Sequence, residues 1–283
     1  MPFLAKNHAD PIGRFTGYYE PLLRGSLTRN GPYQTPLHAR PPDLVTVELS
    51  RFLDDGRGRK LAGRVVDGKL VPYDTRAQIV RGSLAGHELL WVDDAIDAFF
   101  VQVQGSGRVR LDTGEEVRVG YAATNGHRYT AIGRILIAEG HLTPQTVSMQ
   151  SIRAYLLAHP ERADEVMNQN ASYVFFELSR GEGPFGSQGV VLTAGRSLAI
   201  DRNFIPQSAP LWLDTMAPVA GADAEQPFRR LVIAQDTGGA ILGPVRGDVY
   251  FGGDETAADL AGRMKGRGRY FVLLPTAAAA RLP

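Results

Sequence analysis

The sequence has 283 residues. Its 31 Lys and Arg against 30 Asp and Glu give a net charge of +1, so the overall electrostatic field of the protein does not favour the binding of nucleic acid. It has no cysteine, which excludes disulfides, thiolate metal sites and a cysteine nucleophile. The 32 glycines and 18 prolines favour a turn-rich β architecture, and no apolar stretch reaches the roughly 18 residues that span a membrane.

An aromatic segment near the N-terminus is predicted to be a strand. Phe15–Pro21 places Tyr18 and Tyr19 on opposite faces, so that one can pack while the other lines a surface. Residues 32–36 begin and end with proline and indicate an extended linker. The first residues lack the apolar region of a signal peptide, so we expect a cytoplasmic protein or a chain that begins after a removed targeting segment.

The middle of the chain mixes hairpin and helix signals. Leu61–Tyr73 predicts a hairpin that turns at Asp67-Gly68, and Asp112-Thr113-Gly114 predicts a second hairpin turn. Helical spacing, proline boundaries and a capping Thr75 predict helices over residues 76–81, 130–139, 147–159, 163–168 and 256–264.

Two glutamines and a turn of small residues form a candidate binding surface. Phe99–Gln104 is predicted to be a strand, in which Gln102 and Gln104 face one side. That side is either a solvated strand face or a wet groove. Gly105-Ser106-Gly107 follows without the surroundings of a nucleophile elbow, so it is either a plain turn or a backbone rim for a sugar.

The C-terminal part places three aspartates beside tight turns. The apolar run 231–234 suits a buried strand that leads to Asp236, and Asp248 leads into Val249–Phe251. A third candidate, Asp201, lies upstream. Each carboxylate is either a turn former or a catalytic acid, because a strand-end aspartate near a second carboxylate and aromatic rings can have a raised pKa. The sequence does not show which of the three aspartates has the raised pKa.

Short tripeptide matches suggest other classes of protein. Asp236-Thr237-Gly238 is the tripeptide of aspartic proteases, which need two such aspartates, but the copy at Asp112 is predicted to be a hairpin turn. Arg246-Gly247-Asp248 matches an integrin-type tripeptide without further support. None of the six histidines has the spacing of a metal-binding helix, so we expect neither a metal nor a cofactor.

An ordered set of motifs resembles the membrane-bound lytic transglycosylase A (MltA) family. The motifs are Phe15–Pro21, Val101–Arg108, Asn125-Gly126-His127, Ser148–Arg153, Ser172–Phe176 and Asp236–Ile241. The last looks like part of the three-aspartate (3D) module, at about residues 190–275, whose acids map onto Asp201, Asp236 and Asp248. The resemblance covers roughly Phe15 to Pro275.

This resemblance implies a mainly β fold with two domains. Residues 1–37 and 177–283 would form a double-psi β-barrel that carries out catalysis. Residues 38–176 would form an inserted, β-rich α+β domain for the substrate, and a groove between the domains would hold the glycan.

The resemblance also implies a reaction and a set of site residues. The family cleaves peptidoglycan between N-acetylmuramic acid and N-acetylglucosamine and leaves a 1,6-anhydro end. Its catalytic aspartate falls on Asp248, which would act first as acid and then as base, while Asp236 would tune or orient it. The expected substrate-binding residues are Thr16, Gly17, Tyr18, Tyr19, Gln104, Gly105, Ser106, Asn125 and Asp201.

The expected partner is therefore a peptidoglycan strand, bound by a monomer. The family implies a periplasmic location at the outer membrane, through an N-terminal lipid anchor outside this sequence. A non-catalytic glycan-binding module and an aspartic protease are the competing interpretations.

Overall fold

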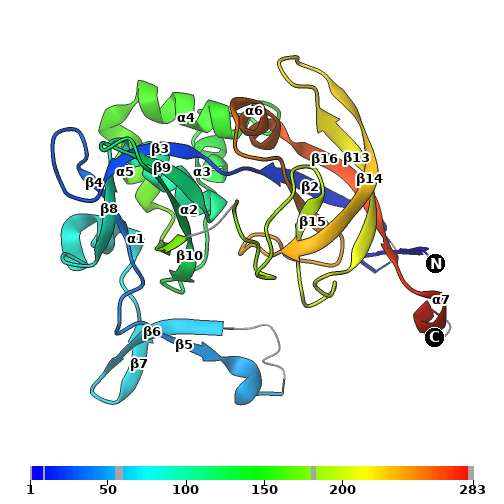
Figure 1. Ribbon diagram of the computed structural model, residues 1–283, viewed down its shortest axis with the longest axis horizontal. Helices are drawn as coiled ribbons and strands as arrows, with labels where there is room; N and C mark the ends of the chain where they lie inside the picture. Colours follow the sequence, from blue (N-terminus) through cyan, green and yellow to red (C-terminus); the bar gives the residue numbers. More distant parts are fainter. Residues whose placement is uncertain (1, 9, 55–59, 180–182, 280–283) are drawn as a thin grey trace. The chain divides into compact units, whose positions relative to one another are not determined.

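The computed structural model describes residues 2–8, 10–54, 60–179 and 183–279, and it divides the chain into two compact units. Unit 1 comprises Met1–Tyr19 and Glu182–Pro283, and unit 2 comprises Glu20–Gly181. The expected mainly β fold, with a closed barrel and a second β-rich part, is confirmed (Figure 1). Among the described residues, no helix is both long and apolar enough to cross a membrane.

Unit 1 is built around a closed barrel. Its strands are β1 (Pro2–Leu4), β2 (Gly13–Tyr18), β12 (Ser197–Ile200), β13 (Pro210–Pro218), β14 (Glu225–Asp236), β15 (Arg246–Tyr250) and β16 (Lys265–Leu273). The order is β16-β13-β14-β12-β15-β2, pairing of β16 with β2 closes the ring, and β1 adds to β16. The pairs β12–β14 and β15–β2 are parallel, whereas the other neighbours are antiparallel.

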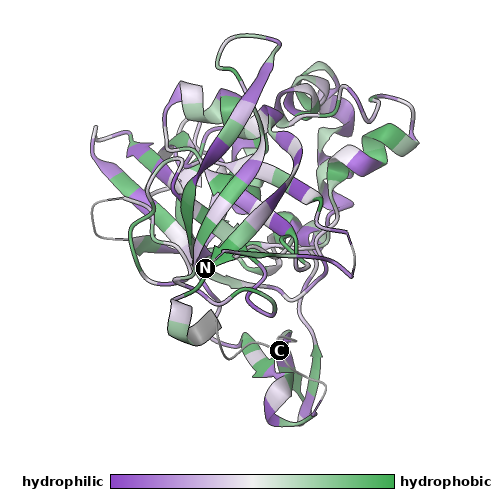
Figure 2. Cartoon of the chain, turned by 90° about the vertical axis from the view of Figure 1, so that its right-hand side faces the viewer, coloured by the Kyte–Doolittle hydropathy of each residue, from purple (hydrophilic) through white to green (hydrophobic). Residues whose placement is uncertain are grey.

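Hydrophobic and hydrophilic residues alternate along the strands (Figure 2), and the buried apolar side chains form the core of the barrel. Phe15 and Tyr270 are fully buried and meet edge to face, with ring centroids 5.7 Å apart. The backbones approach so closely at Gly13 that an added Cβ would lie 1.7 Å from the carbonyl oxygen of Val245. Only glycine fits there, so the close approach of the two backbones in the barrel requires a glycine at position 13.

One helix of unit 1 covers β2. Helix α6 (Glu255–Arg263) begins where the side chain of Asp254 accepts a hydrogen bond from the amide of Ala257. Its Ala261 packs against Gly17, where a Cβ would lie 2.9 Å from the Cα of Ala261. The small residues on both sides therefore hold β2 against the helix. The last helix is α7 (Thr276–Ala279).

Unit 2 contains a six-stranded sheet in the order β11-β10-β9-β3-β8-β4. These strands are β3 (Leu22–Ser26), β4 (Thr35–His38), β8 (Glu88–Val92), β9 (Gly107–Leu111), β10 (Glu116–Thr124) and β11 (Val174–Ser179). Residues 20–37 were expected to belong to the barrel, but they supply β3 and most of β4 to this sheet. The linker predicted at 32–36 overlaps β4, which tolerates Pro36 because β4 is an edge strand.

A second, three-stranded sheet in unit 2 carries the first predicted hairpin. It consists of β5 (Val45–Glu48), β6 (Lys60–Val66) and β7 (Lys69–Pro72), and a short 3-10 turn, η1 (Leu49–Arg51), follows β5. The predicted turn is confirmed, because Asp67 and Gly68 have φ angles of 49° and 73°. The second predicted hairpin is confirmed between β9 and β10.

The helices of unit 2 are α1 (Arg76–Gln78), the π-helical η2 (Ile79–Ser83), α2 (Ala95–Gln104), α3 (Ile132–Ala138), α4 (Met149–Ala158) and α5 (Pro160–Asn168). The strand predicted at Phe99–Gln104 is wrong, because these residues form the second half of α2. Asp94 caps the start of this helix, and Gly105 ends it in the left-handed conformation, with a φ of 87°.

Candidate active site

The carboxyl group of Asp248 is held by residues from β15 and β2. These strands are parallel, and their register sets Asp248 opposite Thr16. The Thr16 hydroxyl donates a hydrogen bond to Asp248 Oδ1 at 2.6 Å and accepts one from Arg246 Nη2 at 2.8 Å. Arg246 and Asp248 are two residues apart on one strand and therefore share a face. The result is a chain of contacts from guanidinium to hydroxyl to carboxyl.

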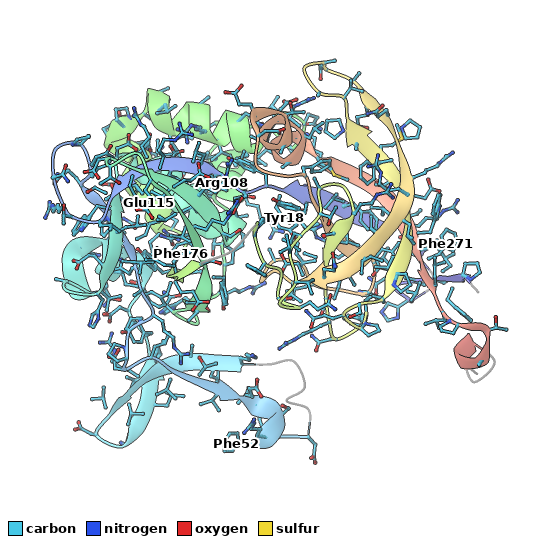
Figure 3. The ribbon with its side chains drawn as sticks, in the orientation of Figure 1. Tyr18, Phe52, Arg108, Glu115, Phe176 and Phe271 are labelled. Carbon is cyan, nitrogen blue, oxygen red and sulfur yellow. The ribbon has the colours of Figure 1, made fainter. Side chains whose placement is uncertain are left out.

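The second carboxylate, Asp236, ends β14 and is held by three donors. Tyr18 donates its hydroxyl to Oδ2 at 2.8 Å, and the amides of Ser187 and Thr237 each donate to Oδ1 at 2.8 Å. Tyr18, labelled in Figure 3, is the last residue of β2, and its ring lies 5.4 Å from that of Tyr250. This set of donors fixes the orientation of Asp236.

Asp236 and Asp248 lie on either side of one alanine. Ala199 of β12 is the register partner of Asp236 on β14 and of Asp248 on β15. Because adjacent strands lie about 4.8 Å apart, the two backbones are roughly 10 Å apart across β12. Ala199 is itself buried, so a small side chain separates the two acids.

Burial raises the pKa of both acids above the ordinary aspartate value. For Asp248, burial is the largest effect and the charge of Asp236 adds to it, while Arg246 and the Thr16 hydrogen bond act in the opposite direction. Burial also raises the pKa of Asp236, against the hydrogen bonds from Ser187, Tyr18 and Thr237. Both residues nevertheless keep some exposed surface, as a proton donor to a substrate must.

The structure brings together only part of the expected N-terminal set. Thr16 and Tyr18 contact the two acids, whereas Gly17 points to the other face of β2 and packs against Phe251 and α6. Tyr19 follows directly after β2 and is partly exposed. Because successive residues of a strand face opposite sides, Gly17 faces the side of β2 that is opposite to Thr16 and Tyr18.

Asp201 has a structural environment, and among the described residues no hydrogen bond joins it to Asp236 or Asp248. It is 7% exposed and accepts hydrogen bonds from the amides of Asn203 and Gly243. Both of these bonds hold loops, as expected of an aspartate that forms a turn.

The four remaining expected residues belong to unit 2. Gln104 is the last residue of α2 and donates to the sulfur of Met149 at 3.8 Å, while Gly105 and Ser106 form the turn after the helix. Asn125 is 1% exposed and bonds the carbonyl oxygens of Asp74 and Ala171 and the amide of Tyr173. Its amide group therefore joins three segments in the interior.

Three contributors were missed in the sequence. Arg246 and Tyr250 flank Asp248 at a spacing of two, which is a readable signal once the segment is known to be a strand. Ser187 donates its backbone amide to Asp236, and its side chain also helps to lower the pKa of that acid, but no motif in the sequence marks this residue. The Arg246-Gly247-Asp248 tripeptide lies in β15 and not on a recognition loop.

No cluster of three or more potential metal ligands occurs in the part of the chain that the structure describes. The arrangement at Asp248 and Asp236 can supply and recover a proton. It presents an acid with a raised pKa, next to a second acid whose geometry is fixed by hydrogen bonds.

Comparisons with known proteins agree along most of the chain. Residues 14–177 match the family described as MltA specific insert domain, and residues 196–274 match the 3D domain. The membrane-bound lytic murein transglycosylase A of Escherichia coli K12 is 33% identical over 275 residues, which cover 94% of this chain and 67% of the relative.

Solved structures show the same relationship. A membrane-bound lytic murein transglycosylase from Agrobacterium tumefaciens superimposes with a TM-score of 0.85 at 38% identity, over 95% of this chain and 75% of that one. E. coli MltA with bound chitohexaose gives a TM-score of 0.75 at 32% identity, over 92% and 71%.

Proposed function

The chain belongs to the MltA family, and from this premise we propose that it is a lytic transglycosylase of peptidoglycan. It cleaves the β-1,4 bond between N-acetylmuramic acid and N-acetylglucosamine and forms a 1,6-anhydromuramoyl end. The observation that carries this proposal is Asp248 itself, a partly accessible acid whose pKa is raised by burial and by a second carboxylate.

Asp248 acts in two successive proton transfers. Its raised pKa favours the protonated form, which donates a proton to the glycosidic oxygen as the bond from that oxygen to the anomeric carbon breaks. The resulting carboxylate then removes the proton from the muramoyl 6-hydroxyl. The bond between O6 and the anomeric carbon forms, and Asp248 ends the cycle protonated.

Asp236 orients and tunes Asp248 and does not exchange protons with the substrate. Its three hydrogen bonds oppose the effect of burial on its own pKa, so its charged form is favoured relative to an unbonded buried acid. A negative charge at Asp236 raises the pKa of Asp248 and thereby favours the protonated acid that the first step needs.

No second carboxylate is needed to activate water, because the nucleophile is part of the substrate. Intramolecular attack in well-oriented cases has effective molarities of about 10⁵–10⁸ M, far above the roughly 55 M of water. A site that fixes the muramoyl ring and restricts water therefore favours ring closure over hydrolysis.

The relatives of this chain support both a partner and a location for it. E. coli MltA has been solved with chitohexaose, which supports a glycan strand as the ligand of this chain. Unit 1 contains every residue of the Asp248–Asp236 site and is assigned catalysis, and unit 2 is assigned a role in glycan recognition. The related enzymes are named membrane-bound, which supports a place in the cell envelope. We assign a monomer, in the periplasm at the outer membrane, held by an N-terminal lipid.

The two competing interpretations lack such support. An aspartic protease needs two aspartates that share a proton. Here the second copy of the tripeptide, at Asp112, forms the β9–β10 hairpin turn, where Asn30 donates a hydrogen bond to Asp112. A non-catalytic glycan-binding module gives no reason for the raised pKa of Asp248.

Digestion of purified peptidoglycan in ¹⁸O-labelled water tests the reaction. Mass spectrometry should find muropeptides that are lighter than hydrolysed ones by one water and that carry no label at the anomeric carbon. Reducing-end muramic acid with ¹⁸O as the main product would identify a hydrolase. Intact glycan together with tight glycan binding would identify the binding module.

A further inference from the structure

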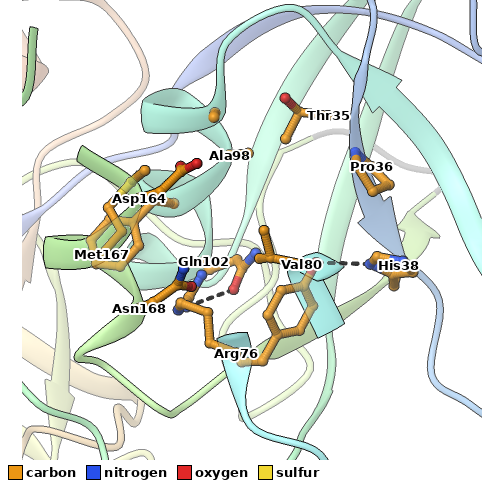
Figure 4. Close-up of a pocket in the computed structure, with 13 residues that line it drawn as sticks. Thr35, Pro36, His38, Arg76, Val80, Ala98, Gln102, Asp164, Met167 and Asn168 are labelled. Carbon is orange, nitrogen blue, oxygen red and sulfur yellow. Dashed lines mark hydrogen bonds between the residues drawn. The ribbon is translucent and has the colours of Figure 1, made fainter. Parts of the chain in front are cut away.

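Unit 2 contains a cavity of about 70 Å³ that takes no part in the proposed reaction. It lies between α2, α5 and β4, where Arg76 reaches Gln102 (Figure 4), and Tyr173 also belongs to its lining. Much of the lining is apolar and comes from Pro36, Ala98, Phe99 and Met167. Since one water needs roughly 10–15 Å³ of such space, the cavity has room for a few waters or one small organic molecule.

Arg76 gives this cavity a buried positive charge. It is 4% exposed, and its guanidinium lies 4.7 Å from the ring centroid of Phe99 and 5.2 Å from that of Tyr173. Nε donates to the carbonyl oxygen of Asn170 at 3.0 Å, and Nη2 donates to Gln102 Oε1 at 2.8 Å and to the carbonyl oxygen of Ser172 at 2.7 Å. Within the described residues, Nη1 has no hydrogen-bond partner.

The charge of Arg76 is not neutralised by the protein. All three of its acceptors are neutral oxygens, and among the described residues no carboxylate lies within ion-pair distance of it. Asp164, on α5, is exposed and lines the same cavity without pairing with Arg76. Although burial lowers the pKa of Arg76 to about 10, the group stays charged near neutral pH. A buried cation without a counter-ion favours an anionic ligand.

His38 and Tyr173 add polar groups to the lining without adding charge. His38 Nδ1 lies 2.8 Å from the hydroxyl of Tyr173, and both side chains are 2% exposed. Burial lowers the pKa of His38 to about 4, so its ring is neutral at physiological pH. The cavity therefore combines one fixed cation, neutral hydrogen-bonding groups and an apolar lining.

We propose that this cavity binds a short aliphatic carboxylate. The carboxylate accepts a hydrogen bond from Arg76 Nη1, and the hydrocarbon part lies against Ala98, Phe99 and Met167. Three sources present this chemistry: a free acid, a small amino acid whose ammonium group faces Asp164, and the alanyl end of a peptide. The site is independent of glycan cleavage, since it involves neither Asp248 nor Asp236.

Calorimetric titration of the full chain with propionate, alanine and N-acetylalanine tests the site and distinguishes the three sources. At least one should bind, and propionamide, which has the shape of propionate without its charge, should bind about tenfold or more weakly, as expected for a lost charge-assisted hydrogen bond. If none of the three carboxylates binds, or if propionamide binds as well as propionate, the proposal is overturned.

Substitutions in the cavity lining test where the ligand binds. They leave Arg76 in place, because its three hydrogen bonds support the fold. Ala98→Leu fills the space and should weaken binding about tenfold or more. Val80 lines the mouth and is 54% exposed, so substitutions there leave the core intact. Val80→Glu should weaken carboxylate binding, and the matched Val80→Lys should not. Equal affinity of Val80→Glu, Val80→Lys and the unaltered chain would place the ligand elsewhere and overturn the assignment.

Discussion

Thr16 stands between Arg246 and Asp248, because its hydroxyl accepts from the arginine at 2.8 Å and donates to the acid at 2.6 Å. Within the described residues, Arg246 and Asp248 form no direct ion pair. A direct pair would hold the carboxyl ionised, whereas a hydroxyl between the two groups weakens the effect of the guanidinium. This geometry explains how an acid that needs a proton can lie on the same strand face as an arginine.

Replacement of Arg246 by Met should move the pH dependence of the reaction upward. The charge of Arg246 lowers the pKa of Asp248, so its removal raises that pKa and keeps the acid protonated to higher pH. The alkaline limb of kcat/KM for peptidoglycan cleavage should therefore shift to higher pH. Arg14→Met, on the neighbouring position of β2, is the matched control and should leave the limb in place. A downward shift in Arg246→Met would contradict the assignment of Asp248 as the acid.

Asp248→Asn should lower the rate of peptidoglycan clearance by about 10²-fold or more, the lower range of acid–base catalysis. The amide keeps the shape and removes the proton that is transferred. Asp236→Asn should cost less activity, because we propose that Asp236 acts on the pKa of Asp248 and not on the substrate directly. If both variants were equally inactive and equally stable, a mechanism with two catalytic carboxylates would be favoured.

The same Asp248→Asn substitution should stabilise the fold, and more so at higher pH. The folded pKa of Asp248 lies above the unfolded value, so its contribution is fully present below the unfolded pKa and is lost as the pH rises through the folded one. Asparagine does not titrate. Urea unfolding should thus show a larger gain over the unaltered chain at pH 8 than at pH 4.

Asp214 provides a control, because its substitution should change stability with pH in the direction opposite to that of Asp248→Asn. Its hydrogen bond and ion pair with Arg229 hold its pKa below the usual range, so its contribution is present above the unfolded pKa and is lost on acidification. Asp214→Asn should therefore cost stability at pH 8 and less at pH 4. If both variants responded to pH in the same direction, the pKa assignments would be wrong.

His38 should make the chain less stable as the pH falls from 6.5 to 4. Its folded pKa is about 4 and its unfolded value is 6.5, so only the unfolded chain takes up the proton in this window. Integration over the window gives a loss on the order of 3 kcal/mol. Unfolding free energies of His38→Gln should be flatter across the window than those of the unaltered chain. Parallel pH profiles would show that the His38 ring is accessible in the folded state.

Local signals in the sequence predicted local structure well. The Asp67-Gly68 turn follows from the backbone freedom of two residues, and no distant contact is required. Phe99–Gln104 was predicted wrongly because its apolar, β-branched composition suits a strand as well as a buried helix. The decisive signals, a cap at Asp94 and a left-handed Gly105, lie just outside the segment.

The site itself could be predicted only in part. The motif resemblance singled out Asp236 and Asp248, but their relation depends on the parallel pairing of β12 with β14, which no local pattern encodes. The contact of Thr16 with Asp248 likewise depends on the pairing of two strands 232 residues apart in the chain. Nothing in the sequence marked the backbone amide of Ser187.

Gly17 was expected to bind the substrate, but its contacts suggest that it packs β2 against α6, and one substitution can distinguish the two roles. The resemblance implied a substrate contact, whereas an added Cβ would lie 2.6 Å from Cε2 of Phe251 and 2.9 Å from the Cα of Ala261. Gly17→Ala must therefore push β2 away from α6, at a cost of about 1–3 kcal/mol. Since β2 carries Thr16 and Tyr18, activity should fall together with the denaturation midpoint. The control is Gly120→Ala on β10, where the nearest atom would lie 3.8 Å away. Gly120→Ala should therefore not lose stability through a steric clash of the added Cβ. If Gly17→Ala kept its stability and lost only affinity for the glycan, Gly17 would be a binding residue and not a packing one.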